Sequence, residues 1–160
     1  MGFKYISAGM EAHEALIGGE SSGGLTVRGH ISGKDGLYAA SLLVEMISVT
    51  GKKLSELVND LFARFGELHT AEYDWPLTPD LKEEIFRMIM TEKRLPEFDR
   101  KVERISWMDG CKVYLDGGWV IVRFSGTEPR VRIFAEAETE KAARNLVEIM
   151  ARHTGLPWAE

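Results

Sequence analysis

The residues from Arg123 to Arg130 combine the side chains needed to bind an oxyanion such as phosphate. Gly126 is flanked by the hydroxyls of Ser125 and Thr127, so backbone N–H groups can converge on an anion while two hydroxyls add donors. Arg123 can form a bidentate, charge-assisted contact to phosphate. On residue types alone, the alternative is a plain strand connection with a Ser-Gly turn, because such turns are common.

A second candidate site lies in a glycine-rich region, where seven of the sixteen glycines fall within residues 18–36. Glu20 and Ser22 lie between glycines, which let a backbone approach a ligand closely. A carboxylate can accept hydrogen bonds from two adjacent sugar hydroxyls, and a serine adds a further polar contact. The alternative is a solvated turn with an ordinary surface acid.

Both segments resemble motifs of the α-D-phosphohexomutases, the phosphoglucomutase/phosphomannomutase family. The string Arg-x-Ser-Gly-Thr-Glu-Pro-x-x-Arg, from Arg123 to Arg132, is similar to the phosphate-binding loop in the last domain of that family. Arg132 is a further phosphate ligand, a support of the loop, or the ion-pair partner of Glu128 or Glu136. The resemblance implies that the phosphate group of the sugar that is not reacting is held by Arg123, Ser125, Gly126 and Thr127.

The glycine-rich region is similar to the Gly-Glu-x-Ser-Gly sugar-binding loop in the third domain of the family. The resemblance implies that Glu20 and Ser22 contact sugar hydroxyls. It extends to the residues before and after the loop, Gly2–Ile6 and Gly33–Leu37. Gly24 stands where many members have histidine, and this departure leans away from the phosphoglucosamine mutase branch.

The resemblance covers only the C-terminal portion of the family's pattern. Members interconvert hexose 1-phosphate and hexose 6-phosphate through an enzyme phosphoserine, a hexose 1,6-bisphosphate and Mg²⁺. Neither the Thr-Ala-Ser-His-Asn-Pro type serine loop nor the Asp-x-Asp-x-Asp metal loop occurs in this sequence. We therefore expect the chain alone to be inactive and to supply phosphosugar contacts to the missing N-terminal domains of the same enzyme. The alternative is a stand-alone, noncatalytic phosphosugar- or anion-binding module, which would carry the same two loops.

The first half of the sequence predicts helices around the glycine-rich region. Apolar residues recur at helical spacing from Leu37 to Ile47, with Asp35 as N-cap and Gly51 as C-cap. A second apolar stripe runs from Leu54 to Phe65. Residues 1–70 are expected to be the C-terminal part of the third domain, a partial three-layer α/β/α unit. Its missing strands would leave an apolar face open, which favours a homodimer.

The second half predicts a complete α+β domain over residues 75–160. Residues 67–78 lose their periodicity, so the domain boundary is placed there, and Thr78-Pro79-Asp80 starts a helix. Alternating apolar residues and Asp-Gly turns predict four mainly antiparallel strands, at residues 102–107, 112–115, 119–124 and 131–137. A final helix begins near Thr139, and its expected buried residues are Ala142, Leu146 and Ile149. The expected architecture is helix, four-stranded antiparallel sheet, helix, which is TBP-like.

The composition is that of an ordinary globular protein, with 160 residues, 44% hydrophobic and 28% charged residues and a net charge of −5. The negative charge and the lack of an aromatic–basic stripe argue against nucleic-acid binding. No apolar run is long enough for a membrane span, and the N-terminus lacks the features of a signal peptide. The single cysteine, Cys111, can form no internal disulfide. These features favour a cytoplasmic protein.

Overall fold

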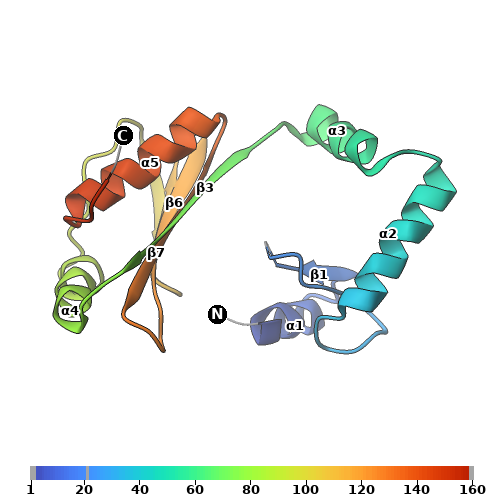
Figure 1. Ribbon diagram of the computed structural model, residues 1–160, viewed down its shortest axis with the longest axis horizontal. Coiled ribbons are helices and arrows are strands. Elements are labelled where there is room, and N and C mark those ends of the chain that lie inside the picture. Colours follow the sequence, from blue (N-terminus) through green and yellow to red (C-terminus); the bar gives the residue numbers. More distant parts are fainter. Residues whose placement is uncertain (1–2, 21, 159–160) are drawn as a thin grey trace. The chain divides into compact units, whose positions relative to one another are not determined.

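The structure is a computed structural model that describes residues 3–20 and 22–158. The chain divides into two compact units, Met1–Phe65 and Gly66–Glu160, which are described separately (Figure 1). No helix among the described residues has the length and apolar character needed to cross a membrane.

The first unit consists of three helices and a short hairpin. Its elements are α1 (Phe3–Ala12), β1 (Ile17–Gly19), β2 (Leu25–Val27), α2 (Gly36–Thr50) and α3 (Leu54–Phe65). The two strands pair antiparallel. Asp35 caps α2 by accepting hydrogen bonds from two backbone N–H groups, and Gly51 ends the helix with φ of 66°. Both helices predicted in this half, and both of these caps, are confirmed.

The apolar side chains of α2 and α3 lie at the surface of this unit. No residue of either helix is buried. Leu37 and Val49 on α2 are 87% and 79% exposed, and Phe65 on α3 is 70% exposed. A soluble monomer rarely leaves large apolar surfaces uncovered. Taken by itself, the first unit therefore exposes many apolar side chains on α2 and α3.

The second unit is built on a five-stranded antiparallel sheet with the strand order β3-β7-β6-β5-β4. Four of these strands match the predicted ones closely. The bounds are β3 (His69–Pro76), β4 (Val102–Ser106), β5 (Cys111–Leu115), β6 (Gly118–Phe124) and β7 (Arg130–Ala137). The α+β architecture is confirmed, with one more strand than the sequence predicted.

The additional strand, β3, lies within residues 67–78, where the sequence predicts a domain boundary and no strand. β3 pairs with β7 over its full length, from His69 opposite Ala137 to Pro76 opposite Arg130. Its residues Ala71, Tyr73 and Trp75 alternate with more exposed ones. The proline is tolerated because it is the last residue of an edge strand. The predicted boundary at residues 70–75 therefore falls inside a strand of the second unit.

One face of the sheet is covered by α5 (Glu140–His153), which contacts β3, β6 and β7 (Figure 1). Thr139 caps α5 by accepting a hydrogen bond from the Ala142 N–H. The prediction that α5 buries Ala142 and Ile149 is wrong, because both are half-buried. The buried face of α5 is rotated by about one residue from the predicted face. It consists of Ala143, Leu146, Val147, Met150 and Ala151.

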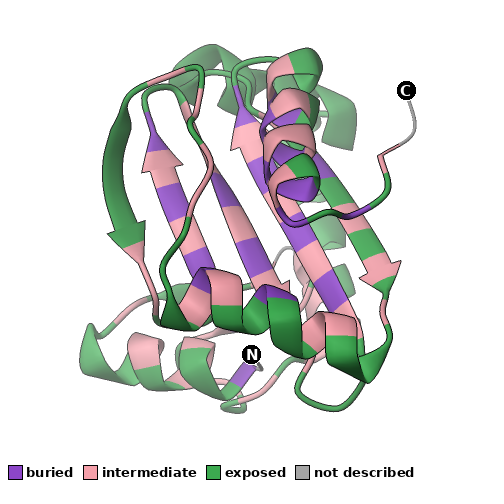
Figure 2. Ribbon diagram, turned by 90° about the vertical axis from the view of Figure 1, so that its left-hand side faces the viewer, coloured by how far each residue is buried: buried purple, intermediate pink, exposed green. Residues whose placement is uncertain are grey.

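Buried and half-buried residues alternate along the central strands, as period-two packing against a helix requires (Figure 2).

α4 (Pro79–Phe86) begins as predicted, since Thr78 accepts a hydrogen bond from the Leu81 N–H and Pro79 occupies the first turn. A π-helical turn, η1 (Arg87–Thr91), continues it. Ile85 and Ile89 join the core beneath the sheet residues.

Candidate functional site

The predicted phosphate loop connects β6 to β7 and folds around the Ser125 side chain. Its Oγ accepts hydrogen bonds from the N–H groups of Thr127 (3.4 Å) and Glu128 (3.1 Å). The hydroxyl proton of Ser125 consequently remains available to donate to a ligand. Gly126 and Thr127 are exposed, and a Cβ added at Gly126 would meet no atom within 4 Å. The tip of the loop is therefore open to an incoming anion.

Lys82 on α4 holds this loop in place, and the sequence analysis did not identify it. Its Nζ donates hydrogen bonds to the carbonyl oxygens of Ser125 (2.5 Å) and Glu128 (2.9 Å). Nearby, the Leu77 N–H donates to the Pro129 carbonyl at 2.7 Å. Lys82 precedes the loop by 43 residues, so no local spacing signals the contact. The hydrogen bonds from Lys82 therefore tie the backbone of the loop to α4.

A shallow groove of about 330 Å³ runs between the loop and α4. It is lined by Pro79, Lys82, Glu83, Phe86, Gly126, Thr127, Glu128 and Pro129. Phe86 makes an edge-on contact with Phe124 at the end of β6, with ring centroids 5.2 Å apart. One side of the predicted phosphate loop therefore lines a concave surface of the second unit.

The three arginines of this segment pair with two carboxylates. Arg123 Nε lies 3.1 Å from Asp109 Oδ2. Arg130 and Arg132 converge on Asp74, with Nε–carboxylate distances of 3.0 and 3.2 Å. Arg132 thus pairs with a residue on β3 and with neither acid named in the sequence analysis. Asp74 was missed because the segment that carries it was not predicted to be a strand.

These contacts change the acidity of Asp74. Partial burial raises the pKa of the Asp74 carboxyl, but hydrogen bonds and positive charge from Arg130 and Arg132 outweigh it, so the net pKa lies below the ordinary 3.8. The hydrogen bond from Arg130 to this carboxylate correspondingly raises the pKa of the Arg130 guanidinium. Asp74 is therefore ionised at neutral pH and offsets part of the arginine charge.

The predicted sugar loop is the turn between β1 and β2. The Glu20 N–H donates to the Gly24 carbonyl at 2.8 Å, and the Gly23 N–H donates to the Glu20 carbonyl at 3.0 Å. Glu20 Oε2 forms an ion pair with Lys34 Nζ at 2.9 Å, while Ser22 is exposed. The second carboxylate oxygen of Glu20 has no hydrogen-bond partner among the described residues.

Gly24 has a specific role in this arrangement. A Cβ added there would lie 2.9 Å from both Glu20 Oε2 and Lys34 Cδ. A larger residue would therefore displace at least one partner of the Glu20–Lys34 ion pair. Gly24, which stands where many family members have histidine, therefore leaves room for the ion pair between Glu20 and Lys34.

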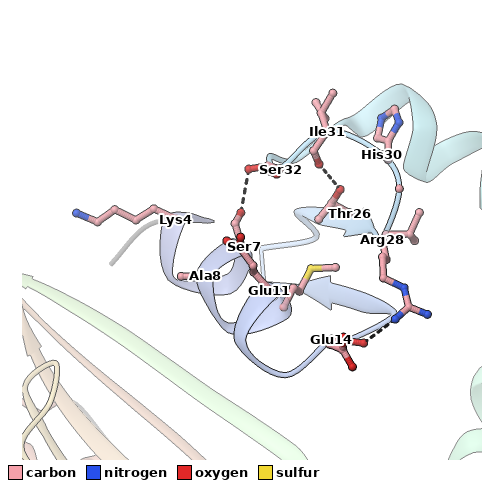
Figure 3. Close-up of a pocket in the computed structure, with 14 residues that line it drawn as sticks. Lys4, Ser7, Ala8, Glu11, Glu14, Thr26, Arg28, His30, Ile31 and Ser32 are labelled. Atoms are coloured by element: carbon pink, nitrogen blue, oxygen red, sulfur yellow. Dashed lines mark hydrogen bonds between the residues drawn. The ribbon is translucent and has the colours of Figure 1, made fainter.

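A larger cavity of about 690 Å³ lies between α1 and the segment after β2 (Figure 3). Some of its polar groups contact one another: Ser7 Oγ donates to the Ser32 carbonyl at 2.9 Å, and Arg28 donates to the Glu14 carbonyl at 3.0 Å. His30, which also lines it, lies 3.0 Å from the N-cap carboxylate of α2. The residues that line this cavity include neither Glu20 nor Ser22.

No residue of this chain is assigned to the Mg²⁺ that the resemblance implies. Among residues 3–20 and 22–158, no three carboxylate, histidine or cysteine side chains come together in a way that could hold a metal ion. The acidic side chains that contact the arginines around the predicted phosphate loop, Asp74 and Asp109, are each paired with arginine. The described residues therefore do not fit a magnesium site, and we derive no chemical step from one.

Family models match both units. The model of phosphoglucomutase/phosphomannomutase alpha/beta/alpha domain III matches residues 1–65, and the model of the C-terminal domain of phosphoglucomutase/phosphomannomutase matches residues 86–153. The chain belongs to the phosphoglucomutase/phosphomannomutase family. Of the two loops described above, the one with Glu20 lies in the match to domain III and the one with Arg123 lies in the match to the C-terminal domain.

Individual relatives agree with this membership of the phosphoglucomutase/phosphomannomutase family. A phosphoglucomutase/phosphomannomutase of Thermococcus kodakarensis is 33% identical over 90% of this chain and 29% of its own length. A phosphoglucosamine mutase of Methanococcus aeolicus is 34% identical over 89% of this chain and 30% of its own length. The crystal structure of a phosphoglucomutase/phosphomannomutase family protein from Burkholderia thailandensis has the same fold, with a TM-score of 0.68 at 22% identity, and covers 100% of this chain and 32% of its own.

The chain spans about 30% of the length of these curated phosphohexomutase relatives. The two relatives are named for different sugars, yet their identities to this chain differ by only one percentage point. Overall similarity therefore does not select a branch of the family, and the sequence-based leaning away from phosphoglucosamine stays a prediction.

Proposed function

We propose that this chain is the substrate-binding C-terminal portion of a phosphohexomutase that interconverts hexose 1-phosphate and hexose 6-phosphate. In this proposal Arg123, Ser125, Gly126 and Thr127 bind the phosphate group that is not being transferred, and Arg132 supports them through Asp74. The observation that carries the proposal is the open β6–β7 turn. It combines a donor hydroxyl and an arginine fork with a family match over the surrounding domain.

The experiment is Arg123→Ala in the full-length enzyme. Loss of a charge-assisted contact to phosphate costs about 1.5–3 kcal/mol, so kcat/KM should fall by about 10- to 150-fold, with an increase in KM. Arg144→Ala, on the exposed side of α5, removes the same charge away from the loop and should leave kcat/KM within twofold. Kinetics of Arg123→Ala that equal those of the unmodified enzyme would contradict the assignment.

We propose that Glu20 and Ser22 bind sugar hydroxyls through the hairpin turn between β1 and β2. The support is the carboxylate oxygen of Glu20 that Lys34 leaves available, together with the exposed serine. Glu20→Gln should raise KM for the hexose phosphate without changing the affinity for inorganic phosphate, because phosphate lacks the hydroxyls. Equal losses for both ligands would indicate a general structural defect and would contradict the role.

The remaining chemistry of the proposed activity belongs outside these 160 residues. We propose that the phosphoserine and the Mg²⁺ ligands lie elsewhere in the full-length enzyme and that a hexose 1,6-bisphosphate is the bound intermediate. This chain alone is then expected to bind phosphosugar without turnover. Mutase activity of the isolated chain would contradict this division of roles.

The apolar surface of α2 and α3 fits the same proposal. In the full-length enzyme, chain segments outside these residues would cover it, since helices of this kind are stable only when their apolar face is buried. When the chain is produced alone, the same surface should drive self-association, which analytical ultracentrifugation measures. A strictly monomeric chain at high concentration would contradict this use of the surface.

A further inference from the structure

Two arginines that flank the phosphate loop, Arg123 and Arg132, lie in a row across the sheet with one carboxylate at each end. Arg123 on β6 is directly opposite Arg132 on β7, and Arg132 is directly opposite Asp74 on β3. On the other flank, Asp109 in the β4–β5 turn lies 3.1 Å from Arg123 Nε. Like charges directly opposite one another destabilise a sheet. The two acids therefore offset the repulsion between neighbouring arginines.

The contact between Asp109 and Arg123 uses only part of the guanidinium. Asp109 Oδ2 accepts from Nε, and no described residue forms a hydrogen bond with either terminal nitrogen of Arg123. The Arg123 side chain is 22% exposed. A guanidinium held at Nε presents its two terminal nitrogens as a fork, which is the geometry that binds a phosphate with two parallel hydrogen bonds.

The turn that carries Asp109 lies against the backbone of β6 and is fixed there by its glycine. Gly110 has φ of 94°, a conformation that side-chain-bearing residues rarely adopt. A Cβ at this position would lie 2.1 Å from the Val122 carbonyl oxygen and 3.2 Å from Arg123 Cα. Only glycine lets the turn approach this closely, so the Asp109 carboxylate is anchored within reach of Arg123.

We propose that Asp109 is a positioning residue that holds the Arg123 guanidinium in the orientation required to bind phosphate. This inference rests on the proposed function of the loop and adds the β4–β5 turn to the phosphate site. Asp109 acts through Arg123, whereas Asp74 holds Arg130 and Arg132. The result is one arginine presented to the ligand and two retained in the sheet.

The test compares Asp109→Ala, Asp109→Asn and the control Asp116→Ala in the 160-residue chain. Asp116 lies in the other Asp-Gly turn of the sheet, and its side chain forms no hydrogen bond or ion pair among the described residues. Two quantities are measured by NMR: the Nε–Hε signal of Arg123 and the Kd for inorganic phosphate. Asp109→Ala should broaden the signal and raise Kd about three- to fivefold, as expected for a partly exposed charged contact.

Asp109→Asn keeps an acceptor for Nε, so it should partly restore both the signal and the affinity, and Asp116→Ala should change neither. In an Arg123→Ala background, Asp109→Ala should have no further effect on Kd, because the group it positions is gone. An unchanged Arg123 signal and Kd in Asp109→Ala, or tighter phosphate binding, would overturn the inference while leaving the proposed function intact. If the unmodified chain and Arg123→Ala bind phosphate equally, the proposed function fails, and this inference fails with it.

Discussion

The edge strand β3 gives the sharpest test of where the second unit begins. A fragment of residues 66–160 contains the whole five-stranded sheet, whereas a fragment of residues 77–160 lacks β3 and keeps the four strands expected from the sequence. Without β3, the β7 backbone loses its pairing partner from His69 to Pro76. We expect the longer fragment to fold cooperatively and the shorter one to be much less stable.

The magnitude follows from the side chains that β3 contributes. Tyr73 stacks on Trp75 with centroids 5.7 Å apart and meets Trp158 at 4.7 Å, and Trp75 Nε1 donates to the Pro157 carbonyl at 3.0 Å. Two half-buried aromatic side chains contribute about 1 kcal/mol each, and their pairing adds about 0.5–1.5 kcal/mol. With buried Ala71 and the lost strand pairing, the deletion should cost about 3–5 kcal/mol.

A domain of this size has a free energy of unfolding of about 5–15 kcal/mol, so the loss consumes much of its stability. Urea denaturation followed by tryptophan fluorescence and circular dichroism measures both fragments. The longer fragment should show one cooperative transition, and the shorter one a transition shifted to much lower urea or none. Equal midpoints for the two fragments would refute the role assigned to β3.

Three further perturbations test other parts of the account. Lys82→Met removes the hydrogen bonds to the loop carbonyls and should weaken phosphate binding about tenfold by NMR titration, with little change in the urea midpoint of the sheet; unchanged affinity would contradict the role of Lys82 in holding the loop. Asp74→Asn should lower the free energy of unfolding at pH 7 by about 0.5–1 kcal/mol. Because the folded pKa of Asp74 is lowered, this contribution is present above the ordinary value of 3.8 and is lost as the pH falls through the folded pKa. The urea midpoints of the variant and the unmodified chain should therefore converge as the pH falls, and a difference that stays constant from pH 7 into the acid range would contradict the charge pairing. Burial raises the pKa of the Cys111 thiol from 9.0 to about 11, so a thiol reagent at pH 8 should label Cys111 only upon unfolding; rapid labelling of the folded chain would contradict its place in the core.

Local signals were sufficient for most elements of the fold. The caps at Asp35, Thr78 and Thr139 involve bonds over two or three residues, so the sequence alone contains the information. The Asp-Gly turns likewise define the hairpins of the sheet. β3 was missed because only three of its positions are apolar and alternate with polar residues, and because the strand ends at Pro76. The exact stripe of α5 was missed because neighbouring apolar residues allow two nearly equivalent faces.

In the candidate site, too, only the residues with a local sequence signal could be predicted. Arg123 and Ser125 could be identified from the order of residues in one short string. Their supports could not, because Lys82, Asp74 and Asp109 are brought to the loop by strand order and register, over separations of 14 to 58 residues. The sequence therefore predicts the groups that meet the ligand better than the groups that position them.

Titration of the 160-residue chain with glucose 1-phosphate, followed by backbone amide NMR, tests the central claim most directly. The account predicts saturable shifts at the phosphate loop, residues 123–132, and at the sugar-loop residues Glu20 and Ser22. Inorganic phosphate should reproduce the first set of shifts without the second. The absence of saturable shifts at residues 123–132 with either ligand would contradict the assignment of a phosphate site to this loop.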